Sequence, residues 1–183
     1  PEDVEFEIKS PAEVVELAVK NGCKAISYTY NEPSVFFEFM LDCAKEARKN
    51  GVKNIWVTSG YINPEPLRVL AEYLDAANVD IKGMSAEFMD KYCGGEPEPA
   101  LQTVKILREK GVHVEMTNLI VPEGNDSDED LKALASWLAE NVGDDAVLHF
   151  SRYFPRYRME SPPPTPLETL VRARKIALDA GLK

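Results

Sequence analysis

Polar and ionisable side chains stand at the ends of five stretches that are typical of β-strands. In chain order these groups are Asn31 with Glu32, Thr58 with Ser59, Asp80 with Lys82, Thr117 with Asn118, and His149 with Ser151 and Arg152. The carboxyl ends of parallel strands meet at one edge of a sheet, so we expect these groups to share a ligand site.

Some of these groups also have a purely structural interpretation. Asn31 and Glu32 could simply cap a helix opened by Pro33, because an acidic residue there complements the helix dipole. Thr58 and Ser59, followed by glycine, could form a plain turn from strand to loop. Both alternatives remain open from the sequence.

Asp80 and Lys82 alternate along one strand, so their side chains face the same side. Inside a barrel they would need each other or a ligand, because a lone buried charge is costly. An internal salt bridge and a ligand pocket therefore both fit. His149 could equally be a hydrogen-bonded core residue, and Arg152 could belong to a solvated loop or to an anion clamp.

The elements that would position these groups alternate along the chain. We expect strands over residues 24–30, 54–58, 78–82, 112–121 and 146–150, separated by helices over 11–20, 33–49, 64–74, 85–92, 98–110, 127–138 and 166–180. This rhythm is typical of βαβ units with parallel strands. No glycine-rich dinucleotide turn follows any strand, so the sequence favours a barrel or part-barrel over a doubly wound sheet.

Composition narrows the function classes. The chain has 183 residues, which suits one domain, and carries 21 basic and 31 acidic residues for a net charge of −10. This acidity argues against sequence-independent binding to nucleic acid or anionic lipid. Cys23, Cys43 and Cys93 match neither a zinc spacing nor a disulfide framework. We therefore expect a reducing, cytoplasmic location, with no signal peptide and no membrane span.

A family resemblance is carried by the segments YTYNEPSVFFEFM, NIWVTSGY, NVDIKGM, LIVPEGNDSDEDL and LHFSRYFPRYRM. In these segments, and in unbroken order over essentially all of its length, the chain resembles the radical S-adenosylmethionine (SAM) proteins related to pyruvate formate-lyase activating enzyme. Within that group it is most similar to the AmmeMemoRadiSam-system branch. The resemblance implies an α/β fold, a partial (β/α)6 TIM-like barrel of parallel strands.

The resemblance also implies an activity and a cofactor site. Such oxidoreductases use a [4Fe-4S] cluster to cleave SAM reductively, giving a 5′-deoxyadenosyl radical that abstracts hydrogen from a substrate. By position, Asn31 and Glu32 fall where the family holds the methionine amino group, and a carboxylate beside an amide suits an ammonium. The full set of implied SAM-binding residues is Asn31, Glu32, Thr58, Ser59, Asp80, Lys82, Asn118, Ser151 and Arg152.

Departures from the family pattern are as informative as the matches. The cluster motif Cys-x3-Cys-x2-Cys is absent, and the three cysteines of this chain cannot mimic its spacing. We therefore expect no metal ligand and no catalytic residue in the chain. We expect residues 1–183 to form a single radical SAM core domain that lacks a first and a last strand and is inactive by itself. Val57 replaces an aspartate linked to a monovalent cation, and Phe154 replaces a histidine.

Two other function classes remain alternatives. A Schiff-base aldolase-type barrel would use Lys82 as a desolvated nucleophile. A non-catalytic barrel would bind a protein partner, and the branch resemblance points to Memo-like or AMMECR-like proteins. Besides SAM, a protein substrate is thus a further partner to consider.

Overall fold

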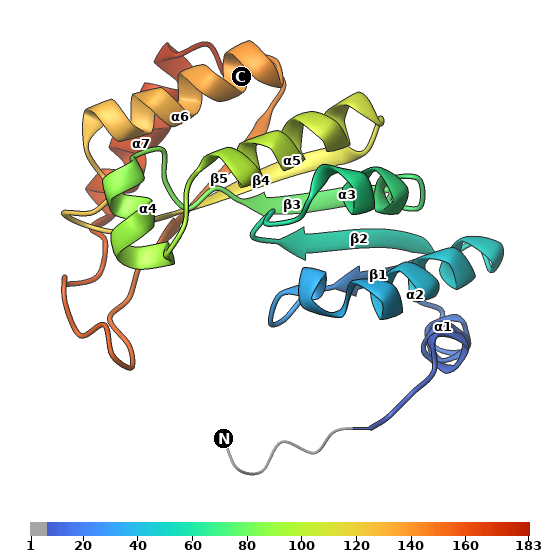
Figure 1. The fold of residues 1–183 in the computed structure, drawn as a ribbon. Coiled ribbons are helices and arrows are strands. Elements are labelled where there is room, and N and C mark those ends of the chain that lie inside the picture. The colour runs from blue at the N-terminus through green and yellow to red at the C-terminus, as the bar shows by residue number, and fades with distance from the viewer. Residues whose placement is uncertain (1–6) are drawn as a thin grey trace.

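The computed structural model describes residues 7–183 and contains one five-stranded sheet in that range (Figure 1). Its strands are β1 (Ala25–Tyr28), β2 (Lys53–Thr58), β3 (Ala76–Asp80), β4 (His113–Ile120) and β5 (Val147–Arg152). Every neighbouring pair is parallel, and the order in the sheet is the order in the chain. Parallel strands in sequential order are the winding of a barrel, so the predicted α/β part-barrel fold is confirmed.

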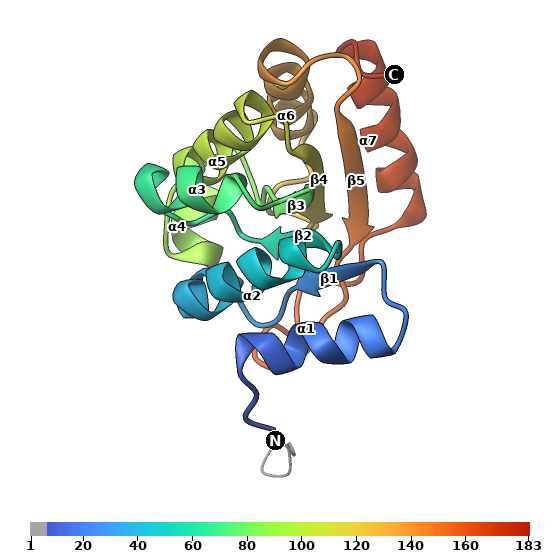
Figure 2. The same cartoon turned by 90° about the vertical axis from the view of Figure 1, so that its right-hand side faces the viewer.

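Helices connect the strands and follow one another around the outside of the curved sheet (Figure 2). They are α1 (Pro11–Lys20), α2 (Phe37–Lys49), α3 (Pro64–Ala71), α4 (Ala86–Cys93), α5 (Glu98–Glu109), α6 (Asp128–Asn141) and α7 (Leu167–Asp179), with a 3-10 turn η1 (Pro33–Phe36) before α2. The sequence predicted one helix from residue 33, and the structure divides it into η1 and α2. None of the helices within residues 7–183 has the length and apolar character needed to cross a membrane.

The core lies between the sheet and these helices. Side chains that are fully buried there come from β2, β4 and α5, for example Trp56, Met116 and Leu107. Strand residues of opposite parity face away from the helices and are only half-buried, and several of these are polar: Asn78, Asp80, Glu115, Thr117 and Ser151. One face of the sheet is therefore an apolar packing surface, and the other is a more open, polar face.

Removing a core side chain tests this packing. We expect Leu107→Ala to lower the free energy of unfolding by about 2–5 kcal/mol, because it leaves a cavity between α5 and the sheet. Val171→Ala on the exposed side of α7 should change it by less than about 0.5 kcal/mol. Urea denaturation followed by circular dichroism measures both; equal effects would contradict the assigned core.

Candidate functional site

A cavity of about 470 Å³ opens where β2 and β3 end, beside α4. Its lining includes Ser59, Tyr61, Asp80, Lys82 and Cys93. In Figure 1 the strand arrows point toward the side of the molecule where α4 lies. The carboxyl edge of the sheet thus carries a hollow of the size that small-molecule sites usually have.

Glu32 joins the end of β1 to the end of β2. Its Oε1 accepts hydrogen bonds from the backbone N–H of Ser34 at 3.1 Å, from the Ser34 hydroxyl at 2.7 Å and from the Thr58 hydroxyl at 2.7 Å. Its Oε2 accepts one from the backbone N–H of Ser59 at 2.7 Å. Glu32 therefore caps η1, as the structural alternative held. It also reaches the cavity wall through Ser59, and Oε2 keeps room for a second donor.

These contacts set the protonation of Glu32. Burial by itself would raise the pKa of this carboxyl, but the hydrogen bonds from Ser59, Ser34 and Thr58 together outweigh burial and hold the pKa below its ordinary value. At neutral pH the side chain is a carboxylate. It can therefore receive a cationic ligand group without first losing a proton.

Asp80 and Lys82 form an ion pair with 2.6 Å between Lys82 Nζ and Asp80 Oδ2. Both side chains remain about one-third exposed and line the cavity. The salt bridge of the structural alternative is thus present, and it lines a cavity, so the two alternatives do not exclude each other. A pair that faces a hollow can exchange its mutual contact for contacts to a ligand carrying both charges.

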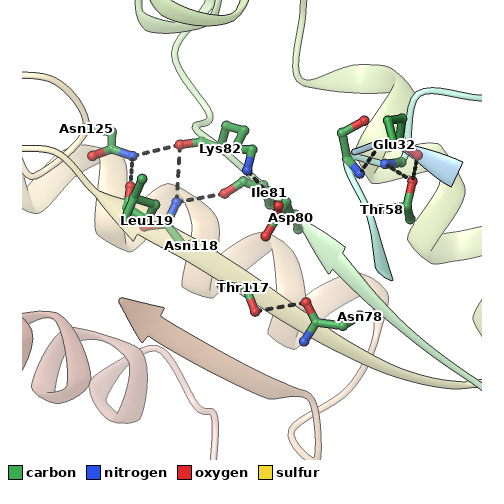
Figure 3. A network of polar contacts seen from close by, with 12 residues as sticks. Glu32, Thr58, Asn78, Asp80, Ile81, Lys82, Thr117, Asn118, Leu119 and Asn125 are labelled. Carbon is green, nitrogen blue, oxygen red and sulfur yellow. Dashed lines mark hydrogen bonds and ion pairs between the residues drawn. The ribbon is translucent and has the colours of Figure 1, made fainter. Parts of the chain in front are cut away.

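Two buried amides hold the backbone beneath Lys82 (Figure 3). Asn118 Nδ2 donates to the carbonyl oxygen of Ile81 at 2.7 Å, and Asn125 Nδ2 donates to that of Lys82 at 2.7 Å. Asn118 is 2% exposed, and its Oδ1 has no hydrogen-bond partner within residues 7–183. The structure therefore places Asn118 behind the cavity, where it positions Lys82, and not on the cavity wall.

The remaining predicted residues lie away from this cavity. Asn31 is exposed in the loop after β1. Arg152 donates from Nε to the carbonyl oxygen of Thr165 at 2.6 Å, and its guanidinium lies 4.9 Å from the centre of the Phe154 ring. Ser151 is half-buried on the open face of the sheet. The structure thus brings Ser59, Asp80 and Lys82 together at the cavity. Glu32 accepts a hydrogen bond from the Ser59 backbone, and the Thr58 hydroxyl donates to Glu32.

Two polar residues in the first half of β4, Glu115 and His113, were not singled out from the sequence. On the open face of the sheet, Glu115 lies 3.1 Å from His113 Nε2 and 2.7 Å from His149 Nε2. Hydrogen bonds with these two imidazoles lower the pKa of Glu115. Period-2 alternation with Thr117 could have identified Glu115, because both share a face of β4. His149 is therefore a surface partner of Glu115 and not a core residue.

An iron–sulfur cluster does not fit the described residues. Within residues 7–183 no three histidine, cysteine, aspartate or glutamate side chains form a group that could hold a metal ion. Cys23 follows α1, Cys43 is fully buried in α2, and Cys93 ends α4. Burial also raises the pKa of Cys43 to about 11, which opposes the thiolate form that iron requires.

The sequence match decides the family. The Radical SAM superfamily matches residues 2–138, well over half of the chain. This chain belongs to the Radical SAM superfamily. An uncharacterised protein of Methanocaldococcus jannaschii, MJ0808, is 45% identical over all 183 residues, which are 100% of this chain and 54% of that relative. The radical SAM chain therefore spans about half the length of the curated relative it matches.

Solved structures support the same fold at low sequence identity. A domain of pyruvate-formate lyase-activating enzyme from Bacteroides vulgatus is 18% identical, with a TM-score of 0.68 over 87% of this chain and 96% of that one. Streptococcus suis SuiB bound to S-adenosylmethionine is 16% identical, with a TM-score of 0.73 over 97% of this chain and 42% of that one. The resemblance to radical SAM proteins, activating enzymes among them, is confirmed at the level of family and fold.

The Glu32 contacts predict a pH-dependent stability. We expect Glu32→Gln to lower the free energy of unfolding at pH 7 by about 1–3 kcal/mol, because an amide NH₂ would face one of the donors that the carboxylate now satisfies. A carboxyl with a lowered native pKa stabilises the fold above its unfolded value of about 4.3, and this contribution is lost as the pH falls through the native pKa. The difference between the two proteins should therefore shrink toward pH 3.

Urea titrations at a series of pH values measure this difference. Glu87→Gln, an exposed first-turn residue of α4, is the matched control and should cost only a few tenths of a kcal/mol at every pH. A cost for Glu32→Gln that does not change with pH would show that its carboxylate charge is irrelevant.

Proposed function

We propose that this chain is the SAM-binding core of a radical SAM enzyme related to pyruvate formate-lyase activating enzyme. The observation that carries the proposal is the cavity at the carboxyl edge of the sheet. A cation, an anion and a hydroxyl line it together at Lys82, Asp80 and Ser59. Superfamily membership supports SAM as the ligand, and the mixture of charges suits a zwitterionic amino acid joined to a nucleoside.

Each side chain at the cavity would bind a different group of SAM. The Lys82 ammonium would hold the methionine carboxylate, replacing part of its contact with Asp80. The Asp80 carboxylate would then accept hydrogen bonds from hydroxyl groups of the ribose. Glu32 Oε2, which has one donor at present, would accept from the methionine ammonium beside the Ser59 backbone. Thr58 and Asn118 would support the site from behind its wall, through Glu32 and through the Ile81 carbonyl. The SAM-binding roles proposed for Asn31, Ser151 and Arg152 would require ligand contacts outside this cavity.

SAM and an iron–sulfur cluster together would supply radical chemistry, in which a hydrogen atom is removed from a substrate. This chain's own contribution is to bind and orient SAM at the edge of the sheet. The described residues do not supply cluster ligands, so we propose that the chain by itself is inactive and that the activity belongs to a protein that also carries them. A cytoplasmic location and a Memo-like or AMMECR-like partner stay predictions of the sequence resemblance.

The aldolase alternative fits the site less well. A Schiff-base lysine becomes nucleophilic when its amine is desolvated or stands beside another cation. Lys82 instead pairs with the carboxylate of Asp80 and is 37% exposed. A carboxylate partner and contact with solvent are the opposite of the desolvated setting that a Schiff-base lysine needs, so the geometry favours a binding role for Lys82.

Titration of SAM into the 183-residue chain tests the binding proposal. We expect saturable heat of binding in isothermal titration calorimetry, and we expect Lys82→Met to weaken the affinity about 10- to 100-fold through loss of a charged hydrogen bond. Lys132→Met on the exposed side of α6 removes the same charge far from the cavity and should leave the affinity unchanged. Equal affinities of the two variants would remove Lys82 from the site.

Anaerobic reconstitution with iron and sulfide tests the proposal that the cluster ligands are elsewhere. We expect the chain to bind no stoichiometric cluster, judged by iron content and the charge-transfer absorbance of iron–sulfur centres. A variant with Cys23→Ser, Cys43→Ser and Cys93→Ser should behave identically. A cluster that forms on the unmodified chain and disappears in this variant would contradict the proposal.

A further inference from the structure

A second hollow lies next to the SAM cavity, on the outer side of the same edge. It has a volume of about 590 Å³ and lies between the first turns of α2, α3 and α5. We call this hollow the rim groove. Of the eight residues that line it, Ser34, Glu38 and Asn63 are polar, and five are mainly apolar: Phe37, Tyr61, Ile62, Pro66 and Pro99. Exposed apolar surface of this kind on a protein with a polar exterior often marks an interaction site.

Tyr61 makes the rim groove a fixed feature. Its ring lines both the rim groove and the SAM cavity, so it forms a wall between them. Its hydroxyl accepts a hydrogen bond from the backbone N–H of Glu96 at 2.6 Å and donates one to the carbonyl oxygen of the same residue. With Tyr61 held in this way, a ligand would find the wall already in place and would lose less side-chain entropy on binding.

The surroundings of the rim groove are acidic. Glu38 lines it, while Glu65 and Glu98 stand next to its lining residues Pro66 and Pro99 in the chain. All three are exposed, and none forms an ion pair with a cation of residues 7–183. Arg68, one turn along α3 from Glu65, has its nearest carboxylate at Glu109, 3.9 Å away.

The helix dipole explains why each of the three glutamates stands where it does, but it does not explain why all three surround the rim groove. Glu38, Glu65 and Glu98 stand in the first turns of α2, α3 and α5, where a negative charge complements the helix dipole. The dipole does not require an apolar floor between the three charges. An apolar floor ringed by unpaired carboxylates is complementary to an apolar side chain flanked by cations.

We propose that the rim groove docks a basic peptide segment of a partner protein, with an apolar or aromatic side chain inserted between α2, α3 and α5 and lysine or arginine residues against Glu38, Glu65 and Glu98. The net charge of −10 attracts such a segment at long range, and the three carboxylates fix its position. The proposal does not depend on SAM binding, because neither Lys82 nor Asp80 lines the rim groove.

Fluorescence anisotropy with a labelled synthetic peptide tests this assignment. The probe has a central Leu-Phe pair flanked on both sides by lysines and arginines, and it is titrated with the 183-residue chain at low and high salt. We expect saturable binding that weakens as salt rises. We also expect the Glu38→Gln, Glu65→Gln, Glu98→Gln variant to weaken it about tenfold. A peptide with Ser-Ser in place of Leu-Phe should bind much more weakly.

The matched control removes the same charge elsewhere. A Glu123→Gln, Glu129→Gln, Glu140→Gln variant has the same net charge as the groove variant, and its three exposed sites lie in or near α6. It should retain wild-type peptide affinity. Ile62→Ser provides a second groove variant, and circular dichroism confirms that it is folded before its expected loss of affinity is measured.

Three outcomes would overturn the proposal. The first is that both triple variants weaken peptide binding equally, which would show that only the net charge of the protein matters. The second is equal affinity for the Ser-Ser peptide, which would leave the apolar floor without a role. The third is no binding at low salt. Each outcome is independent of the SAM titration, so failure of the rim groove and failure of the proposed SAM site can be told apart.

Discussion

The carboxylate of Glu32 is the contact on which the edge of the sheet most depends. It gathers the Ser34 backbone and hydroxyl, the Thr58 hydroxyl and the Ser59 backbone, four donors from two chain segments. β1 ends at Tyr28 and β2 at Thr58, so the ladder between them no longer holds the chain beyond those points. Glu32 continues the connection past the ladder, fixes the start of η1 and directs Ser59 toward the cavity.

The same device recurs one strand further along. β3 ends at Asp80, and the amides of Asn118 and Asn125 take over by binding the carbonyl oxygens of Ile81 and Lys82 (Figure 3). The cavity wall beyond the ends of the strands is therefore held by side chains. The Glu32 carboxylate holds the segment after β2, and the Asn118 and Asn125 amides hold the segment after β3. Since buried polar groups must be paired, these side chains specify the loop conformations as well as stabilise them.

Much of this architecture is readable from the sequence, and the reason is periodicity. Apolar runs separated by helices predicted five strands in the right order, and α1 spans Pro11–Lys20 as expected, with a capping box formed by Ser10 and Glu13 at its start. Polar residues at the strand ends also located the correct edge. The sequence analysis did not assign the residues of β4 to the two faces of the sheet. Asn118, one position after Thr117, lies on the helix side, and Glu115, two positions before Thr117, lies on the open side. Counting alternation from Thr117 would have separated them.

The contribution of loops could not be read in this way. Tyr61 lies in the loop after β2, and Cys93 is the last residue of α4, where no periodic pattern marks it. Only the folded chain brings these two residues to one cavity. The alternatives for Glu32, and for Asp80 with Lys82, could not be separated either, because the structure is compatible with both members of each pair. Glu32 can cap η1 with some lone pairs of its carboxylate and offer another to a ligand. Asp80 and Lys82 can pair with each other and still line the cavity wall.

The Glu32 carboxylate and the Asn118 and Asn125 amides also show which part of a radical SAM site this chain can form by itself. The Glu32 carboxylate and the Nδ2 atoms of Asn118 and Asn125 find their partners within the described residues, and these contacts hold the cavity wall. In the proposed SAM site, the part of this chain is to bind and orient the nucleoside at this sheet edge, whereas electron delivery would require thiolates that the described residues do not bring together. The contacts of the described residues therefore account for the binding wall of the proposed site and not for its redox half.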